Sequence, residues 1–161
     1  MIPNLIPNLL PSVIHRMLVR LCVLGSIASS AAAGGPNGCE NLSAIVPFTQ
    51  LSYSLNIQSI FDSGECLGCH SGNGGTGGAG GLNLETLTSY QSLVSPSVGT
   101  PRVVPGDPLN SVLFLKINCD NPGFGSRMPM DLGPMSSVRQ QVIFDWIRLG
   151  APVLRAGFED R

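Results

Sequence analysis

The chain has 161 residues, a length that suits one folded domain rather than two. Nine Lys and Arg residues face ten Asp and Glu residues, and charged residues make up only 12% of the chain, which excludes a basic nucleic-acid-binding surface. The 20 glycines and 13 prolines predict short helices joined by long loops. Together they make up a smaller share of the chain than is typical of disordered proteins.

An apolar stretch near the amino terminus has the pattern of a secretory signal peptide. It follows Arg16 and Arg20, gives way to Ser and Ala, and ends in three alanines at 31–33. A membrane anchor is the alternative, but crossing a bilayer takes about 20 strongly apolar residues. We therefore predict a signal peptide over residues 1–33, with Met17 as an alternative start. The exported protein would be periplasmic or secreted and would have no membrane span.

The first part of the exported chain is expected to contain an arm and one helix. Residues 34–53 mix polar and apolar side chains with two prolines, which favours an extended N-terminal arm. Helical spacing of the apolar residues that follow predicts a first helix, capped by Ser52 or Ser54, that continues into a Cys-x-x-Cys-His run at 66–70. The glycine-rich tract 71–81 predicts a surface loop, because each glycine loses much backbone entropy on ordering.

Two further short helices are expected in the middle of the chain. Apolar residues over 82–93 favour a short helix. The next helix should run from Pro108 to about Ile117, because Asp107 is a good cap and proline suits the first helical position. Residues 118–134 are rich in glycine and proline and predict an irregular loop.

The last helix has the clearest pattern. Ser137 and Gln140 have the spacing of a capping box, and Gly150 is placed to end the helix. Its expected apolar face consists of Val138, Val142, Ile143, Trp146 and Ile147.

The run Cys66, Cys69 and His70 is the attachment pattern of a c-type haem. Two cysteines three residues apart on a helical turn face one side and can form thioethers with two vinyl groups, while the adjacent histidine binds the iron. A thioredoxin-like redox pair is an alternative, but it needs a flanking strand. A zinc site is another, and it would need Cys39 and Cys119 as further ligands.

The sixth iron ligand is expected to be a methionine. Once residues 1–33 are removed, His70 is the only histidine, so two histidines from this chain cannot bind the iron. Met128, Met130 and Met135 lie in or beside the irregular loop, and Pro129 stiffens it as a ligand loop requires. Methionine as core filler is the competing interpretation. We choose Met128 as the ligand, with Met130 as second choice.

Taken in order, these features resemble the small single-haem cytochrome c domains of the Planctomycete type. The resemblance covers about residues 54–151, and besides the cysteine motif it includes Val104-Pro105-Gly106-Asp107-Pro108, Met128-Pro129 and the helix ending Trp146-Ile147-x-x-Gly150-Ala151. It implies an all-α class I cytochrome c fold, with about four short helices and long Gly/Pro-rich loops around one covalently bound haem c. It also implies His70 and Met128 as iron ligands, and electron transfer to redox partner proteins rather than enzymatic activity.

One pair of cysteines, and the N-terminal arm that carries the first of them, does not belong to this family pattern. With Cys66 and Cys69 committed to haem, Cys39 and Cys119 form an even pair in an oxidising compartment, and we expect a disulfide between them. Two free buried thiols are the alternative. Residues 152–161 are assigned to a C-terminal tail.

Two other functions compete with electron transfer. A haem enzyme or gas sensor, for instance a peroxidase-like protein, would keep an open or labile sixth iron position. A haem-free structural or thiol protein is the third interpretation. The cations Arg102, Lys116 and Arg127 are candidates for binding haem propionates, with a solvated surface role as the alternative.

Overall fold

The computed structural model describes residues 35–72, 78–95 and 101–153, all within one unit of the chain. The signal peptide expected over 1–33 lies outside these residues, as do part of the glycine-rich loop and most of the tail. The described residues contain four α-helices and no strand, so the all-α prediction is confirmed. None of the helices in this described part is long and apolar enough to cross a membrane.

The first helix begins where the sequence predicts and ends earlier. A π-helical turn, Tyr53–Ile57, leads into α1, Gln58–Phe61. The Ser52 hydroxyl accepts the Leu55 N–H at 3.3 Å, which confirms one of the two predicted caps. The chain then passes through turns that include Gly64 at a φ of 90°. The expected continuous helix into the cysteine motif is therefore wrong.

The second helix is shorter than predicted. Helix α2 covers only Ser89–Val94, whereas apolar spacing indicated 82–93. Leu82 is extended, at a φ of −104° and a ψ of 120°, and the Leu84 N–H donates to the His70 carbonyl at 2.7 Å, so the chain before α2 runs along the cysteine motif instead of forming a helix. Helix α2 lies beside α1, and the hydroxyl of Ser89 donates to the side-chain carbonyl of Gln58.

The third helix is split near its start. Asp107 acts as the predicted cap, since its carboxylate accepts the Asn110 N–H at 3.3 Å over the 3₁₀ turn Pro108–Asn110. Ser111 then takes an extended conformation, and its hydroxyl donates to the Asp107 carbonyl at 2.8 Å. Helix α3, Val112–Asn118, follows this break.

Helix α4, Ser137–Arg148, has the predicted length but a different start. Ser136 is the cap residue and makes no side-chain capping bond, so the expected capping box is wrong. Ser137 and Gln140 instead donate to the carboxylate of Glu40, at 3.1 and 2.9 Å. The two residues thus hold the N-terminal arm rather than the helix end.

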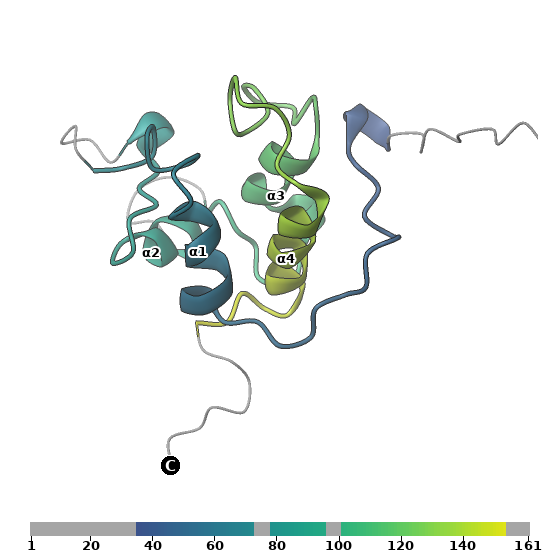
Figure 1. Cartoon of the computed structure of the whole chain (residues 1–161), viewed down its shortest axis with the longest axis horizontal. Helices are drawn as coiled ribbons and strands as arrows, with labels where there is room; N and C mark the ends of the chain where they lie inside the picture. The colour runs from purple at the N-terminus through teal and green to yellow at the C-terminus, as the bar shows by residue number, and fades with distance from the viewer. Residues whose placement is uncertain (1–34, 73–77, 96–100, 154–161) are drawn as a thin grey trace, which may run out of the picture. The chain divides into compact units, whose positions relative to one another are not determined.

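The core forms where α4 meets α3 and the π-helical turn before α1. Ile143, Trp146 and Ile147 are completely buried, and Gly150, at a φ of 93°, follows the last helical residue by two positions and turns the chain away. Val138 is 55% exposed, so its predicted place on the apolar face is wrong. Figure 1 shows α3 beside α4, and the Phe114 and Phe144 rings join the two helices at a centroid distance of 5.0 Å.

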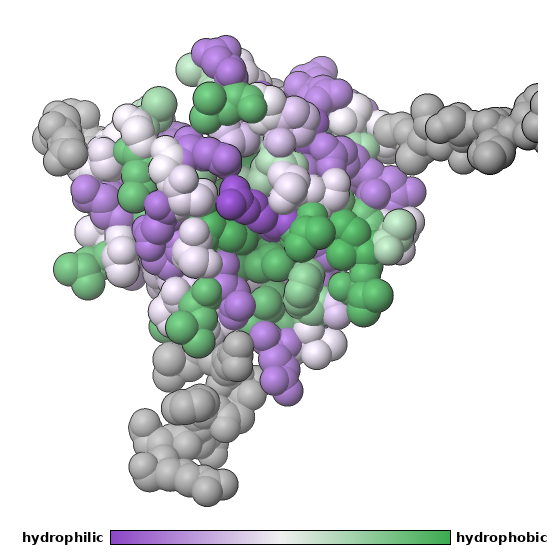
Figure 2. All heavy atoms as spheres, viewed as in Figure 1, coloured by the Kyte–Doolittle hydropathy of each residue, from purple (hydrophilic) through white to green (hydrophobic). Residues whose placement is uncertain are grey.

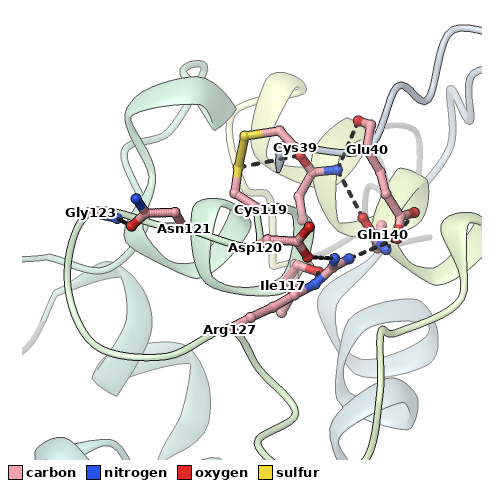
Figure 3. The surroundings of a disulfide bond; sticks show 10 residues. Cys39, Glu40, Ile117, Cys119, Asp120, Asn121, Gly123, Arg127 and Gln140 are labelled. Atoms are coloured by element: carbon pink, nitrogen blue, oxygen red, sulfur yellow. Dashed lines mark hydrogen bonds and ion pairs between the residues drawn. A yellow bond between two sulfur atoms is a disulfide. The ribbon is translucent and has the colours of Figure 1, made fainter. Parts of the chain in front are cut away.

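The arm follows α4 before it enters α1 (Figure 1). The Phe48 N–H donates to the buried Asp145 carboxylate at 2.8 Å. Earlier in the arm, Cys39 forms a disulfide with Cys119, as the sequence predicts (Figure 3). The arm is therefore tied to the end of α3 and to the side of α4.

The chain after α4 returns to the π-helical turn that precedes α1. The carbonyl of Pro152 accepts the Trp146 indole N–H at 3.0 Å, and that of Val153 accepts the Tyr53 N–H at 3.1 Å. Both hydrogen bonds connect the beginning of the predicted tail with the helical core.

Candidate functional site

A single cavity gathers the residues that the sequence proposes for haem binding. It has a volume of about 600 Å³, and Cys66, Cys69, His70, Met128 and Met130 all line it. Its apolar wall includes Phe61, Leu82, Leu84, Val112, Leu113, Ile117 and Met135. Figure 2 shows apolar side chains reaching the surface near the centre of the face drawn there. The size and apolar lining are typical of a site for a cofactor.

The cysteine motif forms one helical turn. The amides of Cys69 and His70 both donate to the Cys66 carbonyl, at 3.3 and 3.0 Å. Cys66 is half-buried and Cys69 is exposed, and both are free thiols. The turn therefore has the local geometry on which the interpretation as a haem attachment motif depends.

Residues at and after the end of the glycine-rich loop hold the backbone of this turn. The Ala79 N–H donates to the Cys69 carbonyl at 2.8 Å, and Leu84 binds the His70 carbonyl. Gly78, at a φ of 75°, passes so close that a Cβ there would lie 3.0 Å from the His70 Cα and 2.5 Å from the Leu82 carbonyl oxygen. Glycine is needed at 78 because no larger residue fits.

The His70 imidazole is not committed to a hydrogen bond within the described part of the protein. Its Nδ1 atom is buried and has no partner among the described residues. A buried polar atom without a partner is unfavourable. An uncommitted imidazole in a cavity wall fits a residue that binds a group placed in the cavity.

The pKa of the Cys66 thiol is shifted in the direction opposite to that of a redox nucleophile. Burial raises its pKa, and the neighbouring Glu65 carboxylate raises that pKa further, while Arg139 acts in the opposite direction. Thioredoxin-like cysteines have lowered pKa values. The disulfide also occupies Cys39 and Cys119, which the zinc interpretation needed as ligands.

The three methionines differ in burial. Met128 is half-buried against the core, and its N–H donates to the Lys116 carbonyl at 2.7 Å. Met130 is 54% exposed, whereas Met135 is buried. All three line the cavity. Of the two candidate ligands, Met128 is the one whose backbone is fixed to α3.

The three candidate cations have different surroundings. Arg102 lines the cavity and donates to the carbonyls of Ser92 and Gly80, at 3.0 and 2.9 Å. Lys116 also lines the cavity, and partial burial lowers its pKa. Arg127 does not line the cavity, and it forms ion pairs with other residues. Arg102 and Lys116 therefore remain candidates for contact with a negatively charged edge of a ligand.

A polar network beside the loop that carries Met128, between α3 and α4, is not evident from the sequence. It joins Glu40, Arg127 and Gln140 near the disulfide (Figure 3), and Asn118 donates to Gln140. These residues belong to the arm, α3, the loop and α4. The sequence contains no local signal for the network, because its members are brought together only by tertiary folding.

Comparison with known families confirms the resemblance. Residues 66–129 match the family model described as Planctomycete cytochrome C. The match runs from the first cysteine of the motif to the proline after Met128, so it includes the cysteine motif and the first-choice methionine, all of which line the cavity. No curated protein and no solved structure matches the chain.

Proposed function

We propose that this protein is a single-haem cytochrome c that transfers electrons between redox partner proteins. In this proposal Cys66 and Cys69 would attach one haem c, while His70 and Met128 would bind its iron. The observation that carries the proposal is the mostly apolar cavity that all four side chains line. The family match supports the c-type cytochrome class.

When bound, haem c supplies iron that is reduced and oxidised by one electron. The cysteine turn would anchor the macrocycle, and the buried apolar wall would exclude water from it. The Met128 thioether is neutral and polarisable, so it would favour ferrous over ferric iron. If His70 and Met128 both bound the iron, no position would remain for a substrate, which is why we propose a carrier rather than an enzyme.

Burial and backbone restraint support Met128 over Met130 as the ligand. Met128 packs against the core and is bound to α3 through its amide, whereas Met130 is more than half exposed. A ligand held in place loses less conformational entropy on binding than one on an exposed side chain.

The disulfide supports export to the periplasm or beyond. Structural disulfides persist in oxidising compartments and are rare in the cytosol. The bond between Cys39 and Cys119 therefore agrees with the signal peptide predicted over residues 1–33. Covalent haem attachment would take place in the same compartment.

A haem assay on the purified protein tests the central claim. We expect a pyridine haemochrome spectrum with one haem per chain, retained after denaturation because the attachment is covalent. Replacing both Cys66 and Cys69 by Ala should abolish it. A wild-type protein that folds without haem, or a double variant that keeps it, would overturn the proposal.

Methionine variants test the ligation. Met128→His should lower the reduction potential by on the order of 100 mV, equivalent to about 2 kcal/mol for one electron, because imidazole favours ferric iron. Met130→Leu should leave the methionine-to-iron charge-transfer band intact. If Met130→Leu loses the band and Met128→Leu keeps it, the ligand is Met130. A ferric wild-type protein without the band that binds cyanide directly supports a haem enzyme or gas sensor.

A further inference from the structure

We infer that Glu40 and Arg127 are positioning residues for the Met128 ligand, an inference that rests on the proposed His70 and Met128 ligation. The two residues lie 87 positions apart in sequence and form an ion pair at 2.7 Å. Through this pair, the N-terminal arm holds the loop that carries the methionine.

Arg127 connects three parts of the chain. Its guanidinium donates to the Glu40 and Asp120 carboxylates, both at 2.7 Å, and to the Ile117 carbonyl at 3.3 Å. Its side chain is only 14% exposed. A mostly buried guanidinium with three acceptors has little freedom to move, so the backbone at 127 is fixed relative to the end of α3.

The backbone of the next residue, Met128, is also bound to α3. The Met128 N–H donates to the Lys116 carbonyl, the position before the carbonyl that Arg127 binds. Two consecutive loop residues are thus held by two consecutive carbonyls of α3. Because α3 also contributes Leu113 and Ile117 to the cavity wall, these bonds set where the Met128 side chain enters the cavity.

Glu40 is a rigid anchor for this arrangement. It follows the disulfide-bonded Cys39, and its other carboxylate oxygen accepts from Gln140 of α4 (Figure 3). The same oxygen accepts from the Ser137 hydroxyl, also of α4. Its amide donates to the Asn118 carbonyl at 3.2 Å. A carboxylate held on both oxygens and at its backbone can keep the arginine in one orientation.

The second acidic partner of Arg127 provides a matched control. The Asp120 side chain is 73% exposed, compared with 30% for Glu40. Water competes well at the exposed carboxylate, so its pairing contributes little. Loss of the more buried partner leaves the arginine with an unfavourable environment and weakens its hold on the loop.

The experiment compares Glu40→Gln and Arg127→Lys with Asp120→Asn in the haem-loaded full protein. Glutamine keeps the size of Glu40 but offers one acceptor oxygen, so it cannot satisfy Arg127 and Gln140 together. Lysine keeps the charge but lacks the planar guanidinium group that donates to several acceptors at once. Imidazole titration of the ferric protein measures displacement of the methionine. Hydrogen exchange of the Met128 amide measures opening of the loop, and urea unfolding measures global stability.

We expect imidazole to bind Glu40→Gln and Arg127→Lys about tenfold more tightly than wild type, and the Met128 amide to exchange about tenfold faster, because hydrogen bonds to charged groups are lost. Asp120→Asn should stay within about twofold of wild type in both measurements.

The positioning role alone is overturned if wild type shows the methionine band while the first two variants match Asp120→Asn in imidazole affinity and amide exchange, even if they unfold more easily. A wild-type ferric protein without the band overturns the proposed ligation instead, and the positioning role with it.

Discussion

Removing the disulfide is expected to destabilise the protein by about 4.5 kcal/mol. The perturbation is the double variant Cys39→Ala with Cys119→Ala. The two cysteines are 80 positions apart, and the chain-entropy relation for a closed loop of that length gives about 4.5 kcal/mol of stabilisation, through restriction of the unfolded chain. Small domains have a total stability of about 5–15 kcal/mol, so the bond accounts for a large part of it.

The folded state should keep its structure without the bond. On either side of the disulfide, the Glu40 N–H donates to the Asn118 carbonyl at 3.2 Å and the Asp120 N–H to the Gly38 carbonyl at 3.3 Å. These hydrogen bonds hold the arm in place independently of the sulfur atoms. The difference between variant and wild type therefore arises mainly in the unfolded chain.

Urea unfolding of the oxidised, haem-loaded protein provides the assay, followed by Trp146 fluorescence and far-ultraviolet circular dichroism. Trp146 is completely buried, so its emission reports on the core. The variant should unfold at a lower urea concentration and with a steeper dependence on urea, because an unfolded chain without the cross-link exposes more surface.

The refuting result is a variant with the same midpoint and slope as wild type. Alkylation of the native, unreduced wild-type protein is the companion measurement: modification of Cys39 or Cys119 would show that the bond is not formed. A variant whose midpoint falls while its slope is unchanged would place the effect in the folded state, contrary to the entropy argument.

Two further predictions concern the core and the histidine turn. Burial raises the pKa of Tyr53 above its usual 10.0, with the neighbouring Ser89 side chain acting in the opposite direction; the Ser89 hydroxyl donates to Gln58, and the Tyr53 hydroxyl has no hydrogen-bond partner among the described residues. Tyr53→Phe should therefore stabilise the protein by about 1 kcal/mol. The variant should also lose less stability in urea unfolding as the pH rises above 10, where the unfolded tyrosine ionises more readily than the folded one. Gly78→Ala should reduce haem incorporation sharply, because the added Cβ meets the His70 backbone, whereas Gly80→Ala meets no atom within 4 Å and should cost only about 1 kcal/mol of unfolding free energy. Equal haem yields from the two alanine variants would contradict the packing argument.

Local rules account for the parts of the fold that the sequence predicts well. The caps at Ser52 and Asp107 and the helix end at Gly150 depend on residues within a few positions of one another. The disulfide follows from counting the cysteines that the haem motif leaves over. Each of these inferences needs no knowledge of how distant segments meet.

Tertiary contacts explain where the sequence misleads. Ser137 and Gln140 have the spacing of a capping box, but Glu40 offers them a carboxylate, and they bind that instead. Gln140 is completely buried while Val138 is exposed, so the buried face of α4 is rotated from the one that hydrophobicity indicates. The arm accounts for the bonds of Ser137 and Gln140, and its path is not encoded in the pattern of the helix.

The two halves of the candidate site differ in the same way. His70 is held by neighbours in sequence, through Gly78, the Ala79 amide and the Leu84 amide. Met128 is held by α3 and, through Arg127, by an arm residue far away along the chain. The family match begins at residue 66 and therefore does not include that arm residue. Since the arm is bonded to the end of α3 and to α4, restraint of the methionine loop is a property of the whole described fold, and the arm is part of the site's support rather than an appendage to it.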